Sequence, residues 1–368
     1  MTTSRETLAR LLSEGKIALG RSAFLDSEPD PASPPDWDRV EGMLLGLAVG
    51  DALGAPLEGL LPATRRARHL LVRDYLPRRG APGTRAGLPT DDTQLSFWTL
   101  EQLLEDGALD PSHLARRFAA DRIDGIGSGT AEFLEKHHRG RPWEECAARS
   151  AGNGALMRVA PLLLPHLPSP SPLLWADVAV AARLTHDDSA STASCLAFAD
   201  LLWKALRMER PPEPSWWADR FLAVLRPLET GATYSPRGGE WREAFEGPLS
   251  AYLDLVLGEA RAGSWGTVDA LERWWSGAFL LETVPTVLWI LERHAHDPEE
   301  AILRAVNDAK DADTAGAIVG AAVGALHGRK RLPARWLVGL SGRTRPGDDG
   351  DVFDLISRAR ERWGPAAR

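Results

Sequence analysis

The spacing of apolar residues is the feature that most constrains this fold. Apolar positions recur three and four residues apart in many segments, separated by Gly and Pro, and Ala and Leu dominate these segments. The alternation of β-branched residues that is typical of strands is nearly absent. Helices are expected at 38–53, 93–106, 111–120, 129–137, 155–164, 173–185, 189–207, 215–226, 247–261, 281–294, 298–308, 314–327 and 350–363. The pattern predicts an all-α chain, folded as a single compact multi-helix globule.

The first 36 residues are expected to be an appendage to this globule. Residues 4–19 have an amphipathic pattern, and Thr3 followed by Glu6 predicts a capping box at its start. The segment 27–38 is rich in Pro, Asp and Ser, which is typical of a linker. We therefore divide the chain into an N-terminal helix with a Pro-rich linker, 1–36, and a main domain, 37–368.

The charge and cysteine content narrow the classes of partner. The net charge is -8, so the field of the whole molecule repels nucleic acid and anionic membrane surfaces. No signal peptide and no run of about 18 uninterrupted apolar residues is evident. Two cysteines, Cys146 and Cys195, cannot form a disulfide framework. We expect a cytoplasmic protein without a membrane or nucleic-acid partner.

Two short acidic motifs carry the chemical signal. One is Thr-Asp-Asp-Thr at 90–93, and the other is Asp-Ala-Asp-Thr at 311–314; each opens a predicted helix. Either motif alone fits helix capping, because Asp and Thr satisfy the free N–H groups of a helix start. Together they supply four carboxylates and two hydroxyls, the all-oxygen set that hard cations require. Adjacent aspartates diverge, which favours a binuclear Mg²⁺ or Mn²⁺ site over zinc.

A third acidic element follows the apolar segment that begins at residue 42. Asp51 is either a hydrogen-bonding residue at a helix end or part of the site, and Glu58 is placed to project from a loop into it. Three glycines four residues apart leave one face of this helix bare, which allows another helix or a ligand to approach closely. They are Gly46, Gly50 and Gly54.

Taken together, these motifs resemble the ADP-ribosylglycohydrolase family, whose members include ADP-ribosylarginine hydrolases and the dinitrogenase reductase-activating glycohydrolase. The matching segments keep the family's order and span about 290 of the 368 residues. They are 42–59, 87–104, 124–130, 152–162, 184–191, 277–291 and 305–328.

The resemblance implies a central cleft with two Mg²⁺ or Mn²⁺ ions, and a hydrolase that releases ADP-ribose from an ADP-ribosylated protein or small molecule, with ADP-ribosyl-arginine protein as the favoured substrate. The implied metal ligands are Thr90, Asp91, Asp92, Asp311, Asp313 and Thr314. Glu58 would approach the metals or the attacking water. Glu58, Asp92 or Asp311 would accept the proton of that water.

The resemblance also implies a set of ligand-binding residues. The loop 152–154 would hold the diphosphate or the adjacent ribose, which is sensible because glycine lets a backbone approach a ligand closely and a helix start favours anions. His186 matches a position near the nucleotide, although capping a helix explains it equally well. The full set is Ser128, Gly129, Gly152, Asn153, Gly154, Met157, His186, Ser276 and Gly277.

Some features depart from the family pattern or leave alternatives open. Ala309 and Lys310 stand where the family usually has two glycines, and the Trp-rich stretch 209–246 belongs to a variable region. The basic stretch 65–79 is expected to be a solvated loop or short helix, with an anion-binding patch as the alternative. A terpene-synthase-like enzyme, a catalytically silent relative, and a hydrolase of serine or other ADP-ribosyl linkages are the competing functions.

Overall fold

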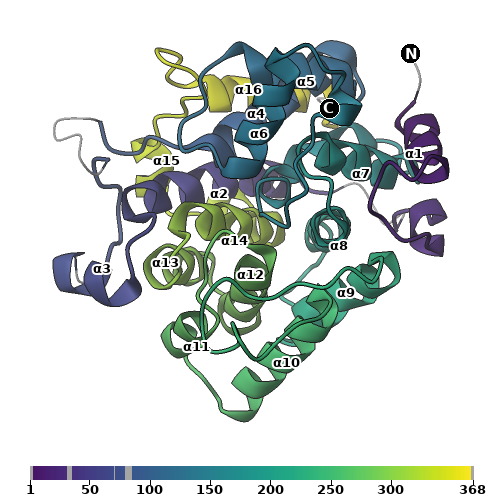
Figure 1. Ribbon diagram of the computed structural model, residues 1–368. Helices are drawn as coiled ribbons and strands as arrows, with labels where there is room; N and C mark the ends of the chain where they lie inside the picture. Colours follow the sequence, from purple (N-terminus) through teal and green to yellow (C-terminus); the bar gives the residue numbers. More distant parts are fainter. Residues whose placement is uncertain (1–2, 31–34, 70, 79–84, 366–368) are drawn as a thin grey trace.

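The computed structural model describes residues 3–30, 35–69, 71–78 and 85–365. Within these ranges the regular elements are helices, and the only pairings typical of strands are isolated bridges such as that between Gly152 and Phe279. The all-α prediction is confirmed. Helices α2, α14, α8 and α12 lie in the middle of the molecule, with α3, α10 and α11 at its edge (Figure 1).

The long helices match the predicted segments closely. Their bounds are α1 Ser4–Ser13, α2 Trp37–Gly54, α3 Pro62–His69, α4 Asp91–Asp106, α5 Pro111–Ala120, α6 Ser128–His138, α7 Leu173–Thr185, α8 Ser189–Ala205, α9 Trp216–Leu225, α10 Leu249–Ala262, α11 Thr267–Arg273, α12 Leu280–His294, α13 Pro298–Asp308, α14 Ala312–His327, α15 Ala334–Gly339 and α16 Asp351–Trp363.

One predicted helix is wrong. Segment 155–164 forms two 3₁₀ turns, η4 Leu156–Arg158 and η5 Ala160–His166, instead of an α-helix. Pro161 and Pro165 lie in this segment, and proline lacks the N–H that an α-helix needs in its interior. Helix α1 also ends earlier than expected, at Ser13, because the chain turns at Gly15, whose φ is +63°.

The centre of the fold is the contact between α2 and α14. Small residues face one another along both helices, and a Cβ added at Gly42 would lie only 2.5 Å from the carbonyl oxygen of Gly324. The facing pairs are Gly42 with Gly324, Gly46 with Gly320, Gly50 with Gly316, and Gly54 with Ala312. In these pairs the residue numbers rise along α2 as they fall along α14, so the two helices run antiparallel. The predicted bare stripe is confirmed, and a helix occupies it.

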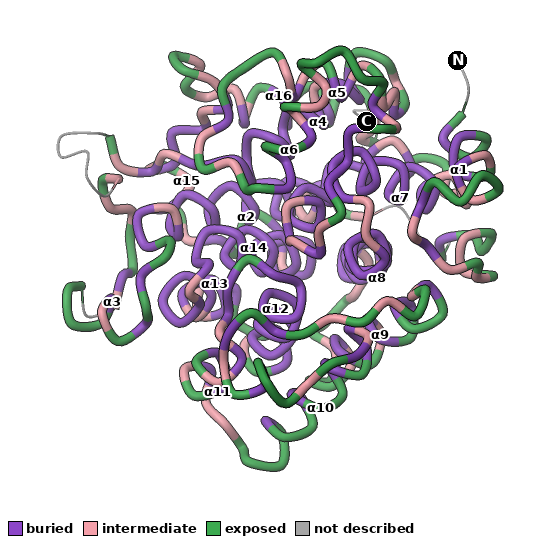
Figure 2. Tube along the Cα trace, viewed as in Figure 1, coloured by how far each residue is buried: buried purple, intermediate pink, exposed green. Residues whose placement is uncertain are grey.

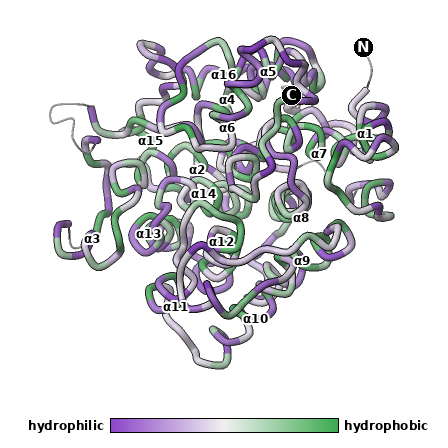
Figure 3. Tube along the Cα trace, viewed as in Figure 1, coloured by the Kyte–Doolittle hydropathy of each residue, from purple (hydrophilic) through white to green (hydrophobic). Residues whose placement is uncertain are grey.

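The antiparallel contact buries both helices almost completely (Figure 2). Hydrophobic residues continue along α7, α8 and α12, whereas the peripheral α3 and α16 are more hydrophilic (Figure 3). The segment Trp37–Leu57 is long and apolar enough to cross a membrane, but 94% of its most apolar window is buried inside the protein. This pattern is typical of the central helix of a globular core.

The N-terminal segment packs onto the main body. The capping box of α1 is formed as predicted, with the Glu6 amide donating to Thr3 Oγ1 at 3.3 Å. Downstream of α1, the Trp175 indole donates to the carbonyl of Ser27 at 2.8 Å and that of Trp203 to Asp30 at 3.1 Å. Part of the predicted linker, 31–34, lies outside the described residues. The division at residue 37 stays a prediction.

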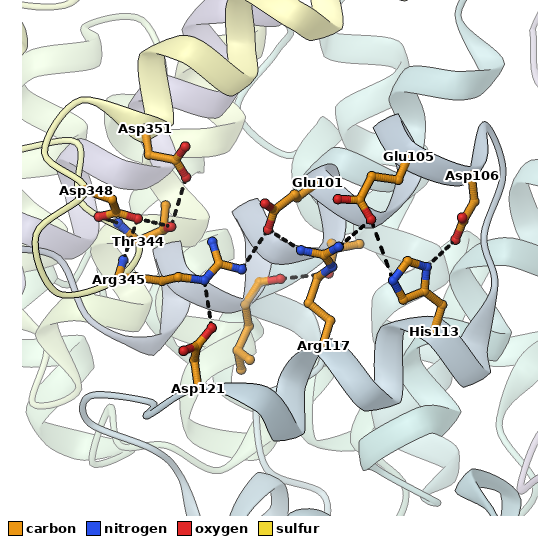
Figure 4. Close-up of polar contacts among 12 residues, drawn as sticks. Glu101, Glu105, Asp106, His113, Arg117, Asp121, Thr344, Arg345, Asp348 and Asp351 are labelled. Atoms are coloured by element: carbon orange, nitrogen blue, oxygen red, sulfur yellow. Dashed lines mark hydrogen bonds and ion pairs between the residues drawn. The ribbon is translucent and has the colours of Figure 1, made fainter.

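A network of charged side chains fixes the outer face of α4 (Figure 4). Arg345, in the segment before α16, donates to Glu101 of α4 and to Asp121 after α5, both at 2.7 Å. Arg117 of α5 bridges Glu101 and Glu105. This network attaches α5 and the C-terminal segment to α4, whose other end opens into the candidate site.

Candidate metal centre and ligand cleft

Three helix ends meet at one place and bring distant acidic residues together. The end of α2 supplies Asp51, the start of α4 supplies Asp92, and the start of α14 supplies Asp313. Each offers a carboxylate oxygen, and these three oxygens lie within 4.8 Å of one another. All three residues are buried, with exposed fractions of 0 to 4%. The antiparallel contact between α2 and α14 explains why residues more than 250 positions apart are neighbours.

Asp51 binds the start of α4 across the site. Its carboxylate accepts from the amide of Thr90 at 2.9 Å and from its hydroxyl at 2.7 Å. It also accepts from the amide of Thr93 at 3.0 Å and from its hydroxyl at 2.6 Å. Thr90 therefore does not cap its own helix, and a carboxylate from α2 satisfies the free N–H groups instead. Asp51 thus fits both alternatives: it accepts hydrogen bonds from the start of a helix, and it belongs to the acidic cluster.

Burial and mutual repulsion dominate the electrostatics of the acidic cluster, although Arg65 attracts Asp313 and Lys310 attracts Asp311. Burial and the neighbouring carboxylates raise the pKa of Asp92 and of Asp313 well above the ordinary value. Burial likewise raises the pKa of Asp91 and that of Asp311. Asp92 Oδ1 is buried and has no hydrogen-bond partner within the described part of the chain. An acceptor left without a donor, among repelling carboxylates, fits a divalent cation with oxygen ligands.

Asn153 and Ser276 fix the position of Asp311. The amide nitrogen of the Asn153 side chain donates to Asp311 Oδ2 at 2.6 Å. The backbone amide of Asp311 donates to the carbonyl of Ser276 at 3.0 Å, and that of Lys310 to Ser276 Oγ at 3.1 Å. Trp275 and Ser276 have left-handed φ values of 77° and 41°, which are strained for residues other than glycine. This strained turn therefore holds the start of the second acidic motif.

A buried arginine secures the segment that carries Glu58. The Arg65 guanidinium is fully buried and donates to the carbonyls of Leu57 at 3.1 Å, Leu60 at 3.0 Å and Val306 at 2.7 Å. It thereby joins both sides of Glu58 to α13. The first residues of the basic stretch 65–79 thus lie on a short helix, α3, with Arg65 pointing inward. Residues 70 and 79 lie outside the described residues.

The acidic cluster opens into a cleft with about 600 Å³ of empty space. This volume includes space open to solvent at the mouth of the cleft. Acidic side chains line one part, and glycines and hydroxyls line another. The lining residues are Glu58, Asp91, Gly125, Gly127, Ser128, Gly129, Thr130, Ser150, Gly152, Asn153, Gly154, Met157, His186, Arg237, Ala278, Asp311, Asp313 and Thr314.

His186 forms part of the cleft wall as a neutral imidazole. Burial lowers the pKa of His186 to about 3. Arg158 donates to Thr185 Oγ1 at 2.7 Å, and this hydroxyl lies 2.8 Å from His186 Nδ1. The Thr185 hydroxyl thus occupies Nδ1, and Nε2 faces the cleft glycines. A Cβ at Gly129 would lie 2.6 Å from Nε2, which explains the requirement for glycine there.

Most of the predicted site residues lie together. Two of them lie beneath the cleft: Thr90, which donates to Asp51, and Asp92, which accepts from Thr314. Ser276 and Gly277 lie behind Asp311 and are not among the described residues that line the cleft. The ligand, catalytic and substrate-binding roles of these residues stay predictions.

Sequence reasoning missed several cleft residues. Arg237, Thr130 and Ser150 line the cleft without having been singled out. Arg237 comes from the variable Trp-rich stretch, where no spacing connects it to the acidic motifs. The one local signal is the Gly-Gly pair that follows Arg237, which suits a backbone conformation that other residues rarely adopt. Gly239 indeed has a left-handed φ of +79°.

The fold and cleft define an all-α protein in which helix ends gather carboxylates suited to a divalent cation. The model of the ADP-ribosylglycohydrolase family matches residues 32–365, and the chain belongs to this family. The protein is accordingly a glycosidic hydrolase of the ADP-ribosylglycohydrolase class.

Named relatives and a solved structure agree with this membership. The ADP-ribosyl-[dinitrogen reductase] glycohydrolase of Rhodospirillum rubrum is 27% identical over 83% of this chain and 90% of its own. The ADP-ribosylarginine hydrolase Tri1 of Pseudomonas putida is 28% identical over 85% of this chain and 80% of its own. A solved "ADP-ribosylglycohydrolase-related protein complex" is 30% identical with a TM-score of 0.63, covering 89% of this chain and 99% of its own.

Proposed function

We propose that the protein hydrolyses the bond between ADP-ribose and an arginine of a modified protein, with two Mg²⁺ or Mn²⁺ ions in the cleft. The observation that carries this proposal is the buried Asp92 Oδ1, which has no hydrogen-bond partner among the described residues and lies among converging carboxylates beneath the cleft. Such ions would orient ribose hydroxyls and lower the pKa of a bound water. The ligands would be Thr90, Asp91, Asp92, Asp311, Asp313 and Thr314, and we add Asp51 because of its position in the cluster.

Two carboxylates of the cleft are candidates to accept the proton of the attacking water. Asn153 holds Asp311 in place, so a carboxylate at the cleft floor is oriented to accept a proton from water. Glu58, held by the Arg65 contacts, lies in the cleft wall and is the other candidate for this proton transfer. Burial raises the pKa of Asp311, which favours its protonated form, whereas Glu58 is exposed.

Arginine is favoured over serine by the charge of the cleft. Glu58 lines it with a carboxylate, which complements a cationic guanidinium and has no counterpart in a serine hydroxyl. The substrate guanidinium also carries its proton already and can leave as a neutral guanidine, whereas a serine alkoxide demands protonation by an acid. The name of the Pseudomonas relative, an ADP-ribosylarginine hydrolase, points the same way.

The test is release of ADP-ribose from ADP-ribosyl-arginine and ADP-ribosyl-serine peptides, with Mg²⁺, Mn²⁺ or chelator. We expect release from the arginine peptide, lost with chelator and in Asp313→Asn. Asp254→Asn, on the exposed face of α10, is the control and should behave as wild type. Faster release from the serine peptide would reassign the linkage, and metal-independent release would refute the metal role.

We also propose a cytoplasmic location. Cys146 and Cys195 are both buried and free, which is typical of proteins in reducing compartments. Cell fractionation with a compartment marker tests this expectation.

A further inference from the structure

One cation lies in the wall of the otherwise acidic cleft. Arg237 belongs to the segment 234–239, which crosses the cleft rim between α9 and α10. Among the described residues that line the cleft, it is the only lysine or arginine. His186 adds no positive charge near neutral pH because it is held neutral. An anionic part of a ligand would therefore meet one cationic side chain in the described lining of this cleft.

The fold holds Arg237 in a defined position. Its backbone amide donates to Glu282 Oε1 at 3.0 Å, and its guanidinium stacks over the Phe279 ring at 4.3 Å from the centroid. Gly238, the next residue, packs directly against the Trp275 ring, which leaves no room for a Cβ. Stacking on an aromatic face restricts a guanidinium, so less entropy is lost when it binds a ligand.

The guanidinium nitrogens of Arg237 make no ion pair or hydrogen bond with the part of the chain that the structure describes. The nearby Glu282 carboxylate accepts from the Arg237 backbone, not from its side chain. Many other arginines here are paired, as Arg226 is with Asp254 at 2.6 Å. The Glu282 carboxylate attracts the guanidinium without accepting from it, so the guanidinium keeps its donors available, in the planar arrangement that matches two phosphate oxygens.

Arg237 also lies beside the glycine loop of the cleft. Phe279, on which it stacks, forms a bridge with Gly152, and the Asn153 amide donates to the carbonyl of Ala278 at 3.2 Å. The side chain of Asn153 in turn reaches Asp311. The glycine loop thus lies between the acidic cluster and Arg237. A ligand that holds a ribose at the acidic end would extend its phosphates along this loop.

We propose that Arg237 is the anion-binding residue of the cleft and pairs with the diphosphate of the bound ADP-ribosyl group. This inference rests on the proposed function. It explains how a protein of net charge -8, with a carboxylate-lined site, accommodates a doubly anionic ligand. The metal end would hold the ribose, the glycine loop would lie alongside the phosphates, and Arg237 would supply the opposite charge.

The test is calorimetric titration of the metal-loaded protein with ADP-ribose and with adenosine, which has no phosphate. We expect Arg237→Gln to weaken ADP-ribose binding about ten-fold or more, because a charge-assisted hydrogen bond is lost. Adenosine binding should not change. Arg237→Lys should recover part of the affinity, and the salt dependence of ADP-ribose binding should be shallower in Arg237→Gln. Arg242→Gln is the matched control, since it removes one exposed charge from the same region.

Each outcome separates this inference from the proposed function. Unchanged ADP-ribose affinity in Arg237→Gln, with normal hydrolysis by the wild type, would overturn the role of Arg237 alone. Equal weakening of ADP-ribose and adenosine would also overturn it, because it would indicate a displaced segment. A wild-type protein that neither binds ADP-ribose nor releases it from peptides would overturn both.

Discussion

Gly316→Ala tests the contact between α2 and α14 on which the acidic cluster depends. A methyl group at residue 316 would lie 2.5 Å from the carbonyl oxygen of Gly50 and 2.8 Å from Cγ1 of Val306. Relaxed carbon contacts to oxygen or carbon begin at about 3.3 Å. The two helices must therefore separate by roughly 1 Å, at a point two residues from Thr314.

The expected cost follows from two opposing effects. Overpacking a dense core costs about 1–3 kcal/mol, and the upper part of this range applies because the clashing oxygen belongs to a backbone. Alanine recovers about 1 kcal/mol through its better helix propensity. The net loss of unfolding free energy is therefore about 2 kcal/mol, which corresponds to a fall of a few degrees in Tm.

The assay is urea denaturation of the metal-free protein, together with the rise in Tm on adding Mn²⁺. Gly258→Ala on α10 is the control, since no atom lies within 4 Å of its added Cβ, and it should gain about 0.5–1 kcal/mol. Gly316→Ala should also show a smaller metal-induced rise in Tm. If both variants gain stability alike, the close helix contact is not what restricts residue 316 to glycine.

Three further substitutions test individual parts of the site. Burial lowers the pKa of His186 to about 3, so the unfolded protein binds one more proton than the folded protein between pH 3 and 6.5. The free energy of unfolding should therefore fall as the pH drops from about 6.5 towards 3, and it should fall less steeply in His186→Gln. Denaturation at several pH values measures this difference. Arg65→Lys should cost about 2–3 kcal/mol, because lysine cannot reach all three carbonyls; an unaltered urea midpoint would contradict this. Asp313→Asn should abolish the metal-induced rise in Tm while leaving the metal-free protein at least as stable, since one repelling carboxylate is gone; an undiminished rise would exclude Asp313 as a ligand.

The helices were predictable because their signals are local. Apolar spacing and capping residues fix α4 and α14 within two residues of their observed starts. The failure at 155–164 is local too, since the apolar pattern continued while Pro161 and Pro165 removed the N–H groups that an α-helix needs. The short helices α11 and α15 went unpredicted because so few residues carry too little periodicity.

The site was predictable only in part, because its assembly depends on long-range packing. The two acidic motifs were apparent from their composition, and the bare stripe of α2 indicated a close neighbour. The identity of that neighbour, α14, determines that Asp51 joins Asp92 and Asp313, and no local pattern contains that information. Arg237 lies in a segment whose position depends on Phe279 and Trp275, far along the chain.

The bonds that Asp51 makes to the start of α4 have a consequence for ion selectivity. Four donors from Thr90 and Thr93 already hold this carboxylate, so it cannot swing outward to suit a wider ion. Ca²⁺ needs oxygens at about 2.3–2.6 Å, whereas Mg²⁺ needs about 2.0–2.1 Å. In the proposed metal site, a carboxylate pinned in this way would discriminate by ionic radius, so part of the preference between these cations would be set before any ion arrives.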